Sequence, residues 1–119
     1  MKCEKLDVWK RACRLSVNVY TYFKENKDYA FKDQITRSSL SIASNIAEGM
    51  EKESNKENLR FIEIAKGSTA ELITQIYIGI EILYIEKEIG FAWIKEANEL
   101  LRMLNGLKKN LKTKERSWA

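Results

Sequence analysis

Polar side chains at helical spacing are the part of this sequence whose residue types could do chemistry. Five of them occur 3, 4, 4 and 3 residues apart, namely Gln34, Arg37, Ser41, Asn45 and Glu48. Side chains at these spacings lie along one face of an α-helix. A second line has spacings of 3 and 4 and consists of Ser68, Glu71 and Gln75. If the two helices are antiparallel neighbours, the two lines face each other across their interface.

Two chemical interpretations of the facing lines are open, besides a solvated helix face. Glu48 and Glu71 could be paired carboxylates in a catalytic pocket. The chain has no His to accompany them, no zinc-ligand spacing and no glycine-rich phosphate loop. We therefore favour a structural polar network over an enzyme, with Arg37 and Glu71 as its ion pair, and we expect no cofactor or metal.

The elements that position these lines are four helices, because the chain of 119 residues has no Pro and only five Gly. Asp7 and Asp28 can cap two helices, and Ser54 with Glu57 has the form of a capping box. Gly49 would end the second helix at its C′ position. We expect helices over about 7–25, 29–48, 54–86 and 91–112. Short connections predict an all-α, antiparallel up-down-up-down four-helix bundle, with one domain over 1–119.

The first helix is apolar over a wider arc than one bundle core needs. One apolar series along it comprises Trp9, Cys13, Val17, Tyr20 and Phe23. A second comprises Val8, Ala12, Leu15, Val19 and Tyr22. Either the helix is deeply packed, or part of this arc contacts another subunit. The last helix has a simpler seam with coiled-coil spacing: Trp93, Ala97, Leu100, Leu104, Leu107 and Leu111.

Basic residues gather at the two segments that an up-down-up-down bundle brings to one end. The first fourteen residues and residues 108–116 carry ten bases against three acids, a net charge of +7: Lys2, Lys5, Lys10, Arg11, Arg14, Lys108, Lys109, Lys112, Lys114 and Arg116. The connection between the second and third helices, at the same end, lowers this to +5. Such an end could bind the phosphate backbone of RNA or DNA. The alternative is that these lysines suit the helix macrodipole and keep the chain soluble.

The N-terminal segment has no apolar stretch typical of a secretory signal, and no apolar run reaches the length of a membrane span. We therefore expect a cytoplasmic protein that does not contact a membrane. Cys3 and Cys13 lack a metal-binding or redox spacing and are expected to be free thiols.

The combination of Asn-Ile-Ala-Glu-Gly (residues 45–49) with the later Gly-Ser-x-x-Glu (residues 67–71) resembles a known family. Further residues share the likeness: Leu6-Asp7-Val8-Trp9, Gln34, Arg37, Ser41-Ile42, Ala65-Lys66 and Gln75. The chain resembles the bacterial 23S rRNA intervening-sequence proteins, also called four helix bundle proteins. The resemblance implies a four-helix bundle that assembles as a toroidal homopentamer. A related branch comprises the accessory variability determinants of diversity-generating retroelements, which are basic pentamers that bind nucleic acid.

Together these patterns predict a non-enzymatic, oligomeric bundle that binds the backbone of structured RNA or DNA through its basic end. The competing prediction is a scaffold that binds only other proteins, or only itself. No motif for base-specific recognition is present in the sequence.

Overall fold

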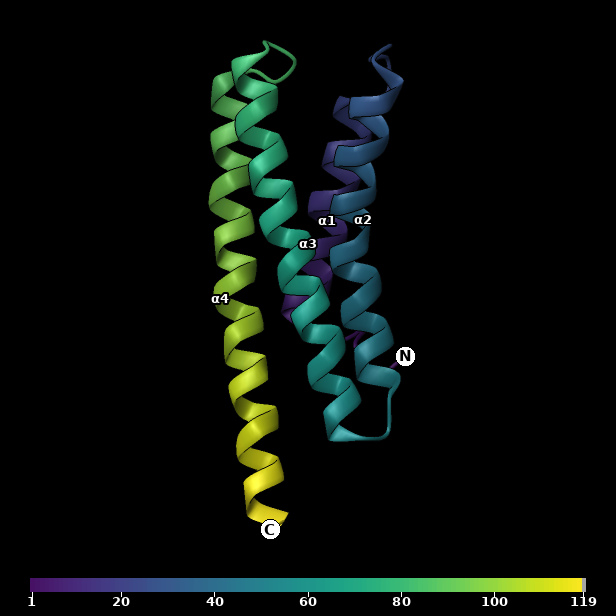
Figure 1. Cartoon of the computed structure of the whole chain (residues 1–119), viewed down its shortest axis with the longest axis vertical. Coiled ribbons are helices and arrows are strands. Elements are labelled where there is room, and N and C mark those ends of the chain that lie inside the picture. The colour runs from purple at the N-terminus through teal and green to yellow at the C-terminus, as the bar shows by residue number, and fades with distance from the viewer. Residues whose placement is uncertain (119) are drawn as a thin grey trace.

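The protein consists of four α-helices in a computed structural model that describes residues 1–118, with the side chains of residues 1–112. The helices are α1 (Asp7–Tyr22), α2 (Tyr29–Glu51), α3 (Asn55–Glu81) and α4 (Lys87–Trp118). Each helix runs opposite to the one before it, and α4 returns beside α1 (Figure 1). The all-α bundle expected from the sequence is therefore confirmed. The molecule is an elongated rod, with principal extents of 52, 21 and 21 Å.

The core of the bundle is formed by one apolar stripe from each helix. Its largest fully buried side chains include Phe23, Ile35, Ile42, Ile62 and Leu100. Buried hydroxyl groups are hydrogen bonded within the core: the Ser16 and Ser39 Oγ atoms lie 3.0 Å apart, and Thr69 donates to the carbonyl of Ala65. These bonds satisfy polar groups whose burial would otherwise be costly.

Local capping signals explain where two of the helices begin. The Asp28 carboxylate accepts a hydrogen bond from the Phe31 N–H, and the Ser54 hydroxyl accepts one from the Glu57 N–H. Glu57 forms an ion pair with Arg60 at 2.6 Å, so only half of the expected capping box is seen. Asp7 does not cap α1 but is its first residue, after Leu6 at the N-cap.

The expected helix boundaries are wrong at several ends. The first helix ends at Tyr22 rather than near residue 25, and α2 continues through Gly49 to Glu51. The third helix ends at Glu81 rather than near residue 86. The fourth helix begins at Lys87 rather than after Gly90, and Gly90 lies inside it. A Cβ atom at Gly90 would lie 2.5 Å from Ile80, so this glycine permits close packing of α4 on α3 rather than ending a helix.

Candidate functional site

Part of the expected polar network connects α2 to α3. The hydroxyl oxygens of Ser41 and Ser68 lie 2.8 Å apart, which is hydrogen-bonding distance. Asn45 donates from its side-chain amide to the Ser41 carbonyl at 2.8 Å and to its hydroxyl at 2.9 Å. Gln75 is half-buried, and its Oε1 has no hydrogen-bond partner in the described part of the chain. At their centre, the two polar lines are thus joined by hydrogen bonds between uncharged groups.

The charged members of the network lie outside this interface. Arg37 is 76% exposed and pairs with Asp33, one turn earlier on α2, at 2.9 Å. Glu71 is exposed as well, so the expected Arg37–Glu71 ion pair is wrong. The physical reason is local: an acid four residues before Arg37 meets it on the same helix face without crossing to another helix. Gln34 and Glu48 are also exposed.

Acidic partners neutralise two members of the basic set. Arg11 of α1 makes a two-pronged contact with Glu96 of α4, with nitrogen to oxygen distances of 2.9 and 2.5 Å. These hydrogen bonds lower the pKa of the Glu96 carboxyl, although its burial acts in the opposite direction. Lys108 forms an ion pair with Glu63 of α3, which lowers the pKa of the Glu63 carboxyl. Both basic side chains therefore link helices.

The other bases lie in the segment before α1, on α1 and on the last turns of α4. Five have no ion-pair partner among the described residues: Lys2, Lys5, Lys10, Arg14 and Lys112. The side chains of Lys114 and Arg116 lie outside the described residues. Glu96, the partner of Arg11, lies about 24 Å along α4 from Lys112, at 1.5 Å per residue. Leu6 and Asp7, at the start of α1, instead border Gly106 and Asn110, close to Lys112. The basic set therefore extends from this end of the rod along α1 as far as Arg14.

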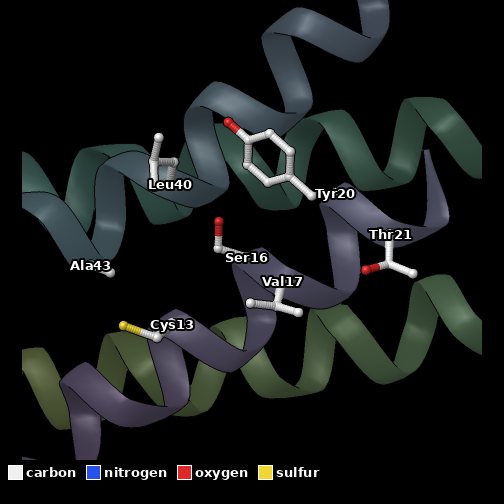
Figure 2. A pocket seen from close by; sticks show the side chains of 7 residues that line it. All are labelled: Cys13, Ser16, Val17, Tyr20, Thr21, Leu40 and Ala43. Carbon is white, nitrogen blue, oxygen red and sulfur yellow. The ribbon is translucent and has the colours of Figure 1, made fainter. Parts of the chain in front are cut away.

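An apolar hollow on the side of the bundle, which we call the α1–α2 groove, is the surface that sequence reasoning left unresolved. Its volume is about 370 Å³, and its lining consists of Cys13, Ser16, Val17, Tyr20, Thr21, Leu40 and Ala43. Figure 2 shows Ser16 pointing between Leu40 and Tyr20 from the side of α1. Ser16 bonds to Ser39, so little unsatisfied polar surface remains in the hollow.

The structure shows which of the two apolar series of the first helix faces the core and which borders the groove. Val8, Ala12, Leu15 and Val19 are buried in the core. The series that contains Cys13, Val17 and Tyr20 borders the groove instead, with Phe23 as its buried end. The excess width of the apolar arc in the sequence indicates an exposed apolar surface on this helix. It does not show which of the two series is the exposed one.

Neither surface carries a recognisable set of ligands for a metal. No cluster of three or more His, Cys, Asp or Glu side chains that could hold an ion occurs within the described residues. Cys3 is buried and Cys13 half-buried, both as free thiols, and burial raises the pKa of each. Among the described residues, no helix is both long and apolar enough to span a membrane.

Comparison with known proteins places this architecture in a family. One solved structure is similar over 86% of this chain and 98% of its own, with a TM-score of 0.80 and 24% sequence identity. It is a protein of unknown function from the S23 ribosomal protein family of Bacteroides thetaiotaomicron, and at this identity it supports the fold alone. No curated protein matches the chain. The 23S rRNA-intervening sequence protein family matches residues 4–106, and the chain belongs to that family.

Proposed function

We propose that this protein is a non-enzymatic scaffold that assembles with copies of itself through the α1–α2 groove. One observation carries the proposal: Val17, Tyr20 and Leu40 are 50%, 42% and 48% exposed around a single apolar hollow. Isolated apolar side chains are common on protein surfaces and need no explanation. Three that converge from two helices on one hollow are typical of an interaction surface.

A second copy of the chain offers a matching surface. Ile64 and Ile78 of α3 are 39% and 48% exposed. Their separation of 14 residues places them on one side of that helix. Because groove and ridge belong to different faces, their contact would be heterologous, and such contacts close into rings when the rotation permits. This agrees with the ring of five subunits implied by the family resemblance.

Light scattering coupled to size exclusion tests the assembly. The wild-type chain should elute at a multiple of 13.9 kDa, and Val17→Glu with Leu40→Glu should lower the mass because two charges would have to be buried. Asn105→Glu, at an exposed position on α4, is the matched control and should leave the mass unchanged. A wild-type monomer at micromolar concentration would refute the assembly, and an unchanged mass of the double variant would refute the groove as its surface.

Sequence-independent binding to nucleic acid is the second candidate function. The supporting observation is that Lys10, Arg14 and Lys112 are exposed and have no ion-pair partner in the described part of the chain. Arranged along the rod, such groups suit an extended phosphate backbone better than one compact anion. A ring of subunits would repeat them around its surface.

A salt titration of RNA and DNA binding tests this second function. Replacing Lys10, Arg14 and Lys112 by Gln should flatten the slope of log affinity against log salt by about 2 to 3, since each lost phosphate contact removes about 0.7 to 0.9. Lys27→Gln, in the turn at the other end of the rod, is the control and should leave the slope unchanged. Undetectable binding at low salt would leave the scaffold as the only proposed function.

A further inference from the structure

The turn between α3 and α4 holds a leucine in a conformation that usually belongs to glycine. Leu83 has a φ of 66°, which is unique among the non-glycine residues that the structure describes. This is the left-handed region, which is strained for a bulky side chain. The leucine gains no burial in exchange, because it is 89% exposed. The fold alone would be better served by glycine at this position.

The turn is fixed firmly to the rest of the bundle. The Tyr84 hydroxyl donates to the Asp28 carboxylate at 2.8 Å, and the Tyr22 hydroxyl accepts from the Glu86 N–H at 2.9 Å. The Tyr84 N–H also donates to the carbonyl of Gly79 at 2.9 Å. The first two contacts tie the turn to the α1–α2 connection and to α1. Leu83 therefore projects from an anchored turn.

A hollow lies directly beside this projection. It has a volume of about 480 Å³ and is lined by Tyr22, Ile80, Leu83, Ile85, Glu86 and Lys87. Ile82, next to Leu83 in the chain, is 45% exposed and extends the apolar surface. Glu86 and Lys87 place opposite charges next to each other on the lining. An apolar knob and an apolar hole thus lie side by side on one end of the rod.

We propose that this end of the molecule binds the same end of a second copy, with Leu83 of each copy in the hollow of the other. A surface that carries both knob and hole is self-complementary, which is the requirement for a two-fold, isologous contact. The two-fold axis would also let Lys87 of one copy meet Glu86 of the other. This contact lies at the tip of the rod, so it is separate from the lateral contact of the α1–α2 groove.

The charge at this end favours a second copy as the occupant. Residues 24–28 and 81–88, which form the two turns here, carry a net charge of only −2. Two such ends can approach without strong repulsion. The charge at the end of the rod with the strained leucine therefore permits pairing with itself.

Leu83→Gly separates a role in binding from a role in the fold. The substitution relieves the strained backbone, so the melting temperature should rise or stay the same. It also removes the knob from both copies, so the dissociation constant of the end-to-end dimer should increase on the order of 100-fold, at about tenfold or more for each buried leucine. Leu83→Met, which keeps an apolar side chain, should retain the dimer.

The experiment is light scattering at micromolar concentration in the Val17→Glu, Leu40→Glu background, which removes the proposed lateral contact. There the chain should have twice the monomer mass of 13.9 kDa, and adding Leu83→Gly should reduce it to 13.9 kDa. Lys87→Glu should also weaken the dimer, and Glu86→Lys in addition should restore it. A chain that is monomeric in this background, or a dimer that survives Leu83→Gly, overturns the inference. The lateral contact is judged separately, from the mass of the Leu83→Gly chain with its groove intact.

Discussion

Gly49 provides the sharpest test of how α2 packs on α3. It is buried and helical, two residues before the end of α2, and not in the left-handed C′ conformation expected from the sequence. A Cβ atom placed at Gly49 would lie 2.8 Å from the Cβ of Phe61 and 3.4 Å from the carbonyl oxygen of Asn58. Because neither atom is the far end of a flexible side chain, the first turns of α3 would have to move.

The expected effect of Gly49→Ala is the difference between two terms. Alanine improves the intrinsic helix propensity by up to about 1 kcal/mol. Overpacking a close helix contact costs about 1 to 3 kcal/mol. The shift of α3 would also strain the hydrogen bonds that the Asn58 amide donates to the Gly49 and Lys52 carbonyls, at 2.5 and 2.8 Å. We expect a net destabilisation of about 1 to 2 kcal/mol, or a melting temperature lower by about 4 to 8 °C.

Gly67→Ala is the matched control for the same substitution on α3. Gly67 is exposed, and a Cβ atom there would meet no atom of another helix within 4 Å, so close helix packing does not require this glycine. The helix-propensity term then acts alone, so Gly67→Ala should raise the free energy of unfolding by up to about 1 kcal/mol. Both variants should be compared by urea unfolding at one protein concentration, since assembly shifts apparent stability. If Gly49→Ala stabilises as much as Gly67→Ala, the close α2–α3 approach is refuted.

Three further predictions concern side chains. Glu71→Ala should change the free energy of unfolding by less than about 0.5 kcal/mol, since Glu71 is exposed; a loss near 3 kcal/mol in urea unfolding would show that it is paired after all. The Arg11–Glu96 pair has a lowered carboxyl pKa, so its stabilisation is present above the unfolded-state pKa of Glu96 and is lost as the pH falls through the lower folded value. Because the two side chains are 39% and 30% exposed, Glu96→Gln should cost at most about 1 kcal/mol at pH 7 and nothing once the pH is below the folded-state pKa of Glu96; a difference independent of pH would contradict this. Finally, Leu100→Ala should cost about 2 to 5 kcal/mol because Leu100 is fully buried, and Leu111→Ala, at a half-buried position, clearly less; equal losses would show that α4 is equally packed along its length.

The parts of the fold that local chemistry determines could be predicted from the sequence. Asp28 and Ser54 cap α2 and α3 as expected, because a side-chain oxygen three residues before an unpaired N–H suffices for such a cap. The heptad-like seam of α4 also holds, with Trp93, Ala97 and Leu100 buried. In each case the information lies within one or two helical turns.

The features that were missed depend on contacts between distant residues. Two apolar arcs on α1 were visible in the sequence, but only packing against α2 and α4 decides which one enters the core. The turn at Leu83 carries none of the usual signals, because the chain accepts a strained leucine where glycine or asparagine would mark a helix end. The pairing of Arg37 with Asp33 differs from these two features because it could be predicted from the sequence. An acid four residues before an arginine on a helix is a local signal for an ion pair, and the expected pairing with Glu71 disregards it.

The placement of the basic residues depends on how far each helix extends along the rod. Arg11 faces Glu96 and the start of α1 borders Gly106 and Asn110, so the part of α4 that extends past α1 begins after Asn110. Figure 1 shows the C-terminal turns of α4 extending beyond the turn between α2 and α3. The expected bounds of about 7–25 and 91–112 gave these two helices more similar lengths than the 16 and 32 residues observed. Arg11 and Arg14 therefore lie on the flank of the rod, beside Glu96, and Lys112 lies nearer its tip. A phosphate backbone that contacts both Arg14 and Lys112 must follow the long axis of the molecule.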